Sequence, residues 1–491
     1  MYSLGIDIGS SSIKISMLDI QTGKCATEVT LPEREMPINA PHKGWAEQDP
    51  DLWWEYVCQG IQNIGNNYDL QQVACIGITY QMHGLVCLDA SGAPLRPSII
   101  WCDSRAVEVG RAATEALGTD WCQQHLLNHI GNFTAAKLAW VQKNEPDIFA
   151  RIHRIMLPGD YIAYKLSGAM TTTQSGLSEG IFWDYQRKGL CKEVFETLNI
   201  NTEHCCEAGQ SVETLATTSL ETENLLGIPA GVPISYRVGD QPNNAFSLNV
   251  MEPGEVAATG GTSGVVYGVT DQPVTDKASR VNPFLHVNHT TNDPRYGVLL
   301  CLNGCGSANA WARRNIAPEL SYEEINHLAA TAPAGCDGLT VIPFGNGAER
   351  VLGNQYPKAQ IHELDFNRHS RAHLLRATQE GIAFAFCYGI DIMKSMGLKI
   401  NVIRAGQTNL FLSPLFCKTL ATVSGAKIEL YNTDGALGAA RGAAMGAGFY
   451  TSREEAFDSL QLQDSYELDN TMVEPLKKAY QRFLSKLNIK N

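Results

Sequence analysis

The hydrophobic pattern predicts two similar strand–turn–strand units, one in each half of the chain. Apolar residues alternate over Leu4 to Ile6 and Ile13 to Ile15, which is typical of half-buried strands. One glycine and three serines between them have the composition of a tight turn. The stretch Val256 to Val266 repeats this plan around a turn rich in glycine and hydroxyl groups. The repeat predicts two related domains, each offering one such turn to a shared cleft.

Further apolar runs predict an α/β chain. The predicted strands are 73–79, 85–89, 98–101, 233–238, 297–302, 339–344, 401–404 and 427–430. Amphipathic or capped stretches predict helices at 49–65, from 106, and at 132–144, 161–168, 373–393, from 433 and 475–487. Residues 188–227 read as surface helices joined by polar turns. We expect the domain boundary close after residue 245, which gives domains 1–245 and 246–491.

Size, charge and cysteine usage narrow the class of protein. A chain of 491 residues is too long for one hydrophobic core. The net charge is −13 without a dense Lys/Arg run, which argues against a nucleic-acid partner. No apolar run reaches membrane-span length, and the first twenty residues do not resemble a signal peptide. Fourteen cysteines without a C-x-x-C pair indicate free thiols in a reducing cytoplasm.

The two glycine/hydroxyl turns are candidate phosphate sites. Small residues at Ser10, Ser11 and Ser12 leave backbone N–H groups open to an anion, and Asp7 at the mouth of the turn suits a hydrated metal ion. An ordinary N-terminal hairpin explains this stretch equally well when it is considered alone. The second turn, Gly260 to Gly264, favours the phosphate interpretation. A Walker-type loop is excluded because its motif does not occur.

Asp240 is the candidate proton acceptor. It follows a predicted strand beside Gly239, close to the predicted domain junction. Transfer of a phosphoryl group to a hydroxyl needs a group that accepts the hydroxyl proton, and a carboxylate serves this purpose. A helix-capping aspartate is the alternative for this turn considered alone.

Polar side chains after two neighbouring strands form a candidate sugar site. Such positions, just past strand ends, are where α/β sheets bind ligands. Each residue also has an ordinary structural explanation as a core histidine, a core tryptophan or a surface cation, and only their clustering favours a site. The candidates are Gln81, His83, Trp101, Asp103 and Arg105.

Together with the segments around them, the candidate residues named above resemble those of the FGGY carbohydrate kinases, and within that family those of the xylulose kinases. The matching stretches run in family order along nearly the whole chain: GIDIGSSSIK, WAEQDPDLWW, QMHG, RPSIIWCDSR, FTAAKLAWV, LPGDYIAYKLSG, GD at 239–240, GGTSGV, PFGNGAER, QEGIAFA and DGALGAARGAA. The resemblance implies two ribonuclease-H-like, actin-type domains with an active-site cleft between them. It also implies ATP- and Mg²⁺-dependent phosphorylation of a terminal sugar hydroxyl, with D-xylulose as the expected substrate and D-xylulose 5-phosphate as the product.

The resemblance also implies roles for individual residues. Asp240 matches the catalytic base, which also touches the sugar, and Asp7 matches the metal-associated aspartate. Met82, His83 and Asp103 match sugar contacts. The expected nucleotide contacts are Ser10, Ser11, Ser12, Lys14, Gly261, Thr262, Ser263, Gly304, Gly406 and Asn409. Family members often form homodimers.

Three departures from the family pattern bear on substrate and nucleotide binding. Ala405 to Thr408 replaces a glycine-rich adenosine loop, and Asn132 stands where a glycine or an aromatic residue is usual. Tyr80 replaces a small residue, and we expect it to narrow the sugar pocket.

Three other functions remain open at this point. They are a kinase of the same family for ribulose or a related polyol, a sugar sensor without catalysis, and an actin-type ATPase that drives a partner protein.

Overall fold

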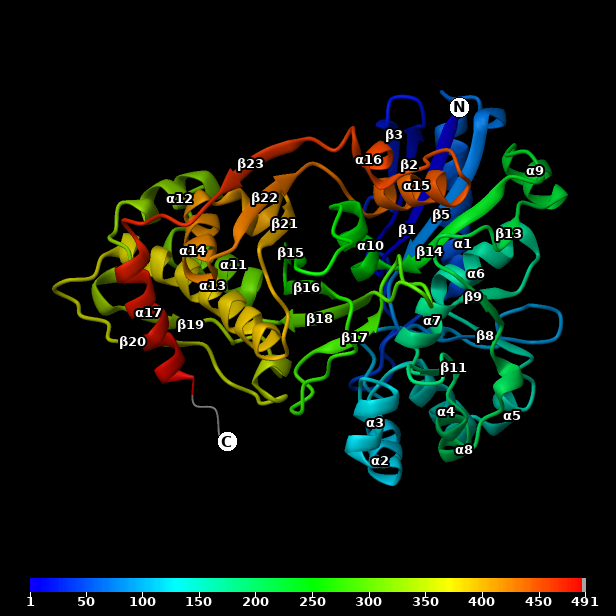
Figure 1. The fold of residues 1–491 in the computed structure, drawn as a ribbon, viewed down its shortest axis with the longest axis horizontal. Helices are drawn as coiled ribbons and strands as arrows, with labels where there is room; N and C mark the ends of the chain where they lie inside the picture. Colours follow the sequence, from blue (N-terminus) through cyan, green and yellow to red (C-terminus); the bar gives the residue numbers. More distant parts are fainter. Residues whose placement is uncertain (488–491) are drawn as a thin grey trace.

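The computed structural model describes residues 1–487 and has two lobes, each built on one β-sheet (Figure 1). The chain begins in the right-hand lobe of Figure 1, and its C-terminal helix α17 (Val473–Lys486) lies in the left-hand lobe. Helix α10 (Asp240–Ser247) lies between the lobes. The predicted α/β architecture with two sheet-based domains is confirmed.

The first sheet has the strand order β13-β14-β5-β1-β2-β3. Strands β1, β2 and β3 are antiparallel neighbours, whereas β5 and β14 run parallel to β1. Their bounds are β1 Tyr2–Ile8, β2 Ile13–Asp19, β3 Lys24–Leu31, β5 Val73–Tyr80, β13 Ala216–Thr217 and β14 Pro233–Gly239.

The second sheet has the order β17-β18-β16-β15-β21-β22-β23. Strands β15, β16 and β18 are antiparallel neighbours, and β21 and β22 run parallel to β15. The bounds are β15 Glu255–Gly260, β16 Gly264–Thr270, β17 Asn282–Leu285, β18 Tyr296–Leu302, β21 Val402–Gly406, β22 Lys427–Tyr431 and β23 Leu462–Tyr466. Both sheets thus contain the same five-strand core, which confirms the repeat that the sequence predicts.

Helices cover the faces of both sheets. The first lobe contains α1 Pro50–Gly65, α2 Val107–Leu117, α3 Thr119–His125, α4 Thr134–Asn144, α5 Pro146–Phe149, α6 Pro158–Ser167, α7 Gln174–Glu179, α8 Lys192–Leu198 and α9 Leu220–Leu226. The second contains α11 Cys305–Ile316, α12 Tyr322–Ala330, α13 Arg371–Ser395, α14 Pro414–Ser424 and α17. As predicted, Asp49 caps α1, where its side chain accepts from the Asp51 amide.

The prediction for residues 188–227 is partly wrong. Only α8 and α9 are helices of more than one turn there. Strand β12 (Glu207–Gly209) pairs with β9 (Thr171–Thr173), and β13 pairs with β14 at the edge of the first sheet. These strands are too short to show a period in the sequence, and it is pairing with distant strands that forms them.

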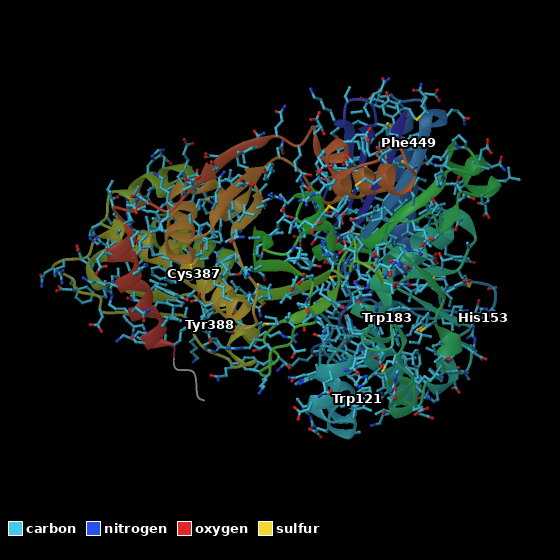
Figure 2. The ribbon with its side chains drawn as sticks, in the orientation of Figure 1. Trp121, His153, Trp183, Cys387, Tyr388 and Phe449 are labelled. Carbon is cyan, nitrogen blue, oxygen red and sulfur yellow. The ribbon has the colours of Figure 1, made fainter. Side chains whose placement is uncertain are left out.

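Helix α15 (Gly435–Gly446) returns the chain to the first lobe after the second sheet is complete. It packs across β1, β5 and β14 of the first sheet, among the blue strands of Figure 1. Phe449, just after α15, lies in this right-hand lobe, whereas Cys387 and Tyr388 of α13 lie in the left-hand one (Figure 2). The chain therefore crosses between the lobes more than once.

The approach of α15 to the sheet is a contact between backbones. A Cβ atom at Gly5 would overlap the carbonyl oxygen of Ala436, and one at Gly77 would overlap that of Ala439. Hydroxyl groups of the sheet also reach helix carbonyls: Ser3 Oγ donates to Ala440 O over 2.6 Å. The small residues of this helix thus meet glycines of the sheet.

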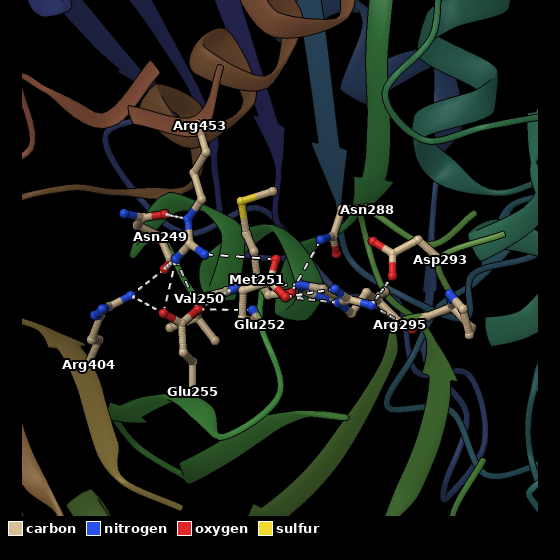
Figure 3. Close-up of polar contacts among 12 residues, drawn as sticks. Asn249, Val250, Met251, Glu252, Glu255, Asn288, Asp293, Arg295, Arg404 and Arg453 are labelled. Carbon is tan, nitrogen blue, oxygen red and sulfur yellow. Dashed lines mark hydrogen bonds and ion pairs between the residues drawn. The ribbon is translucent and has the colours of Figure 1, made fainter. Parts of the chain in front are cut away.

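An ionic cluster fixes the segment that joins α10 to β15 (Figure 3). Glu255 accepts hydrogen bonds from Arg404 Nη1 over 3.1 Å and from Arg453 Nη2 over 3.0 Å. The two arginines also donate to the backbone oxygen of Asn249. Arg404 belongs to β21, and Arg453 opens α16 (Arg453–Phe457), whose Phe457 ring contacts Phe246 of α10. The connection between the lobes is therefore held from both sides.

Among residues 1–487, none of the helices combines the length and the apolar composition that a membrane crossing requires.

We predict that Gly77→Ala destabilises the protein by about 3 kcal/mol, at the upper end of overpacking losses, because neither backbone can move aside without breaking sheet or helix hydrogen bonds. Chemical unfolding measures the effect. Gly189→Ala is the control, since its Cβ would meet no atom within 4 Å. Equal stability of the two variants would contradict the proposed backbone contact.

Candidate active site

Three parallel strands of the first sheet end side by side and bring the predicted acidic residues together. Ile8 at the end of β1 is in register with Tyr80 at the end of β5, and Tyr80 is in register with Gly239 at the end of β14. Asp7 and Asp240 therefore lie at one edge of the sheet, two strands apart. Gln81 follows β5 at the same edge, and its backbone N–H donates to Ile8 O over 2.8 Å.

Burial raises the pKa of both carboxyl groups, and neighbouring negative charges raise that of Asp7 further. Burial, followed by the nearby charges of Asp240 and Asp434, raises the pKa of Asp7 to about 7. Burial raises the pKa of Asp240 to about 6. Gly435, at the start of α15, allows the approach, because a Cβ there would overlap Asp7 Oδ2. A divalent cation would relieve the repulsion among these carboxylates, and oxygen ligands are those that Mg²⁺ prefers. The residues present therefore fit a magnesium site.

Lys14 forms ion pairs with two carboxylates of the chain. Its Nζ lies 2.7 Å from Asp434 Oδ2 and 3.0 Å from Glu28 Oε2. Asp434 in turn caps α15, since its Oδ1 accepts from the Leu437 amide over 2.9 Å. Lys14 thus connects the first hairpin to α15. In this structure the partners of Lys14, a predicted nucleotide contact, are these two carboxylates.

Each predicted phosphate turn keeps polar groups at its surface. In the first, Gly9 N donates to Ser12 O over 3.0 Å, Ser11 is exposed, and Ser10 and Ser12 are half-buried. In the second, Gly261 and Ser263 are half-buried and Thr262 is exposed.

The second turn adjoins the first turn of α11. The Ser307 amide donates to Thr262 O over 3.3 Å, and a Cβ at Gly306 would overlap Gly261 O. Gly304, buried, caps α11 next to them. The loop after β21 reaches the same turn, since Leu410 packs on Gly260. Gly406 and Asn409, the predicted nucleotide contacts in that loop, lie half-buried and exposed respectively.

A cavity of about 550 Å³ lies beside α11, next to Ser307 and therefore next to the second turn. Its lining combines aromatic, aliphatic and amide groups, as small-molecule pockets commonly do. Lining residues are Gly304, Ser307, Trp311, Pro343, Asn346 and Thr378, with others from β20 (Gln360–His362) and α13.

His83 presents a hydrogen-bond acceptor. Its backbone is left-handed, with φ of 63°, and its amide donates to Glu179 Oε1 over 3.2 Å. Burial, followed by the charge of Lys137, lowers the pKa of His83 to about 3, so the ring is neutral. Nδ1 lies 3.0 Å from the carbonyl oxygen of Glu179 and must donate to it. Nε2 is then the unprotonated nitrogen, which accepts a hydrogen bond.

Several residues that support His83 are not among the sequence candidates. Lys137 Nζ donates to His83 O over 2.7 Å, and Glu179 is fully enclosed. Phe284 of β17 contacts the His83 ring with centroids 5.4 Å apart, so the second lobe also packs against this site. Lys137 lies within the FTAAKLAWV stretch, which marks its segment but not its role. Nothing in the sequence pattern singles out Glu179 or Phe284.

Asp103 and Arg105, both predicted sugar contacts, bind one another. Arg105 Nη2 donates to Asp103 Oδ2 over 2.7 Å, and Arg105 Nη1 donates to Glu47 Oε1 over 2.7 Å. The guanidinium stacks on Trp45, 3.7 Å from the ring centroid. Ala46 N also donates to Asp103 Oδ2, over 2.6 Å. The charged groups of Asp103 and Arg105 thus already have hydrogen-bond partners within the protein.

The other predicted sugar contacts lie at the edge of the sheet. Met82 is 5% exposed and sits beside Gly239, the residue before Asp240. Trp101 is 54% exposed, and its Nε1 donates to Ser10 Oγ over 3.3 Å. Asn132 donates to the backbone oxygen of Asp103.

Tyr80 lies in the protein core, and its expected effect on the width of the sugar pocket stays a prediction. Its side chain is fully buried in the core beneath the sheet, where the ring packs on Gly159 of α6. Successive side chains of a strand point to opposite faces, and Tyr80 takes the core face.

Comparisons with known proteins agree with this geometry. Two family models match, "FGGY family of carbohydrate kinases, N-terminal domain" over residues 2–247 and the corresponding C-terminal domain over 256–449. The chain is 31% identical to a xylulose kinase of Haemophilus influenzae over 82% of both chains, and 26% identical to that of Escherichia coli over 99% of both. Its fold is similar to that of glycerol kinase from Plasmodium falciparum, with a TM-score of 0.89, 20% identity and coverage of 100% and 99% of the two chains. The chain belongs to the FGGY family of carbohydrate kinases.

Proposed function

We propose that this chain transfers the γ-phosphoryl group of ATP to the terminal hydroxyl of D-xylulose and releases D-xylulose 5-phosphate and ADP. The observation that carries the proposal is the register of β1, β5 and β14, which brings Asp7, Gln81 and Asp240 to one edge. The choice of D-xylulose is supported by the relatives named xylulose kinase, which match over most of the chain.

Asp240 acts as the general base. It opens α10 at the junction of the lobes, and the residue before it, Gly239, lies against Met82 and Glu179. As the sugar oxygen forms its bond to the γ-phosphorus, the bond from that phosphorus to the ADP oxygen breaks, and the hydroxyl proton passes to the Asp240 carboxylate. Phosphoryl transfer relies mainly on positioning and charge stabilisation, so one correctly placed carboxylate suffices for the proton.

Sugar hydroxyls bind to acceptors that follow β5, and the segment after β7 (Ser98–Ile99) adds an aromatic surface. His83 offers Nε2, and Gln81 offers its side-chain amide. Trp101 offers an exposed ring face. The Asp103–Arg105 pair holds the loop that carries Trp101, so we assign it a positioning role rather than direct contact.

The two glycine/hydroxyl turns hold the phosphates of ATP, and the cavity beside α11 takes the adenosine. The contact of Ser307 with Thr262 supports this arrangement, because it joins the cavity to the second turn. Asp7, with Asp434 nearby, is suited to hold Mg²⁺. The bound ion would supply charge neutralisation for the phosphates.

Compartment, assembly and domain boundary complete the proposal. All fourteen cysteines are free thiols, which supports our proposal of a reducing cytoplasm. A homodimer and the domain boundary near residue 245 stay predictions.

We predict that D-xylulose has the highest kcat/KM in a panel that includes D-ribulose, L-xylulose, gluconate and glycerol. Coupled detection of ADP measures turnover. A catalytically silent sensor would bind sugar without releasing ADP, and an actin-type ATPase would release ADP without sugar. Absence of sugar-dependent turnover with every ketopentose would refute the proposal.

We predict that Asp240→Asn lowers kcat about 10²- to 10⁴-fold, because the amide cannot accept the proton. Calorimetry with D-xylulose should show binding close to that of the wild type. Asp271→Asn, an exposed position just after β16, is the matched control and should keep full activity. Wild-type turnover of Asp240→Asn would show that another group accepts the proton.

We predict that Asp7→Asn raises the Mg²⁺ concentration for half-maximal activity roughly tenfold or more, which corresponds to at least about 1.4 kcal/mol. Loss of a negative charge weakens cation binding directly. Titration of Mg²⁺ at fixed saturating ATP and sugar measures the shift, again with Asp271→Asn as the control. An unchanged Mg²⁺ requirement would assign the metal to other ligands.

A further inference from the structure

Gln48 lies between the predicted sugar contact Gln81 and the predicted phosphate turn. It belongs to β4 (Glu47–Gln48), which pairs with β7 (Ser98–Ile99), and it is 4% exposed. Gln48 Nε2 donates to Ser10 O over 2.7 Å, and Gln48 Oε1 accepts from Gln81 Nε2 over 3.0 Å. One buried amide therefore joins both sites.

The side-chain amide of Gln48 uses its full hydrogen-bonding capacity. Nε2 has a second acceptor in Pro37 O at 3.4 Å, and Oε1 has a second donor in Trp53 Nε1 at 3.3 Å. Backbone carbonyls can only accept, and an indole N–H can only donate. These fixed roles leave one orientation for the amide, with nitrogen toward Ser10 and oxygen toward Gln81. No other side chain of this size offers two donors and two acceptors in that arrangement.

The orientation of Gln48 determines that of Gln81. Because Gln48 presents an oxygen, Gln81 must turn its own nitrogen toward it. Gln81 Oε1 then points away from Gln48. That oxygen is buried and has no hydrogen-bond partner among residues 1–487. A buried acceptor without a donor is costly, so Gln81 Oε1 needs a donor from a bound molecule, either a water or a ligand hydroxyl.

The phosphate turn has a second tie to the same ribbon. Trp101, just after β7, donates from Nε1 to Ser10 Oγ. Ser10 is thus held at its backbone oxygen by β4 and at its hydroxyl by the segment after β7. Both ties come from the side of the molecule where the sugar is proposed to bind.

We propose that Gln48 is a positioning residue that fixes Gln81 as the acceptor for one hydroxyl of the sugar and links that contact to the Ser10 turn. The proposal rests on the proposed kinase function and adds the direction of one hydrogen bond: a sugar hydroxyl must donate to Gln81 Oε1. It also makes sugar binding and the geometry of the phosphate turn depend on the same amide.

The test is steady-state kinetics on the full chain, with a mutant cycle. At saturating ATP, we expect Gln48→Met and Gln81→Met each to raise the KM for D-xylulose about 10- to 100-fold, as expected when a buried hydrogen bond to the ligand is lost. The double variant should be no worse than the poorer single variant, because both changes break one relay. Gln48→Glu should raise the KM for D-xylulose less than Gln48→Met does, since a carboxylate still accepts from Gln81 Nε2 and loses only the hydrogen bond to Ser10 O.

Gln59→Glu is the matched control. Gln59 is exposed on α1, close to Gln48 in the sequence, and the variant should keep the wild-type KM. A wild-type KM in Gln48→Met, or losses that multiply in the double variant, would overturn the relay. If wild-type protein phosphorylates no ketopentose, the proposed function fails instead, and the two failures are therefore distinguishable.

A second measurement does not depend on the folding of Gln48 variants. Wild-type protein is assayed with deoxy analogues of D-xylulose, each lacking one hydroxyl other than the terminal hydroxyl that accepts the phosphoryl group. We expect one analogue to lose about 10- to 100-fold in kcat/KM, and Gln81→Met to lose that discrimination. Equal loss with every analogue in both proteins would contradict the assignment of Gln81 as a hydroxyl acceptor.

Discussion

The contact between the backbone of α15 and the first sheet is the constraint on which the site depends. Gly5 and Gly77 face the carbonyls of Ala436 and Ala439 without intervening side chains. This brings the N-terminus of α15, with Asp434 and Gly435, against Asp7. A helix that stood off by one side-chain layer would leave Lys14 and Asp434 apart. The acidic cluster thus results from close packing rather than from a local motif.

The same crossing ties the two lobes together. After the second sheet, α15 and α16 return to the first, where Arg453 reaches the segment between α10 and β15. Arg404 of the second sheet binds the same Glu255 carboxylate. Asp240, at the other end of α10, lies one short helix away from this cluster. Any change in the relative position of the lobes must therefore be accommodated close to the proposed base.

Much of the fold could be predicted from the sequence. The two hairpins, the buried strand before Gln81, the capped helix after Asp49 and the small-residue helix at 435 all have local signals that the structure confirms. The short strands β12 and β13 have none, because they form by pairing with residues far away in the chain.

The site shows the same division between local and long-range information. A pattern locates Asp7 and Asp240 at strand ends, since strand ends are visible in the sequence. It does not show that Tyr80 faces the core, that Asp103 is engaged with Arg105, or that Phe284 of the second lobe reaches His83. These depend on which face a side chain takes and on contacts between distant segments, and neither has a local signal.

The direction of each hydrogen bond shows what residue identity alone does not, namely which side-chain atoms donate and which accept. Glutamine at 48 and at 81 would each be compatible with donating or accepting, and only the fixed roles of Ser10 O and the Trp53 indole remove the choice. The same reasoning assigns His83, where a backbone carbonyl fixes the proton on Nδ1. Both residues then offer acceptors, which suits a polyhydroxylated substrate whose hydroxyl groups donate. In the proposed site, groups that do not touch the sugar, namely the carbonyl oxygens of Ser10 and Glu179 and the Trp53 indole, therefore set the direction in which Gln81 and His83 can bond.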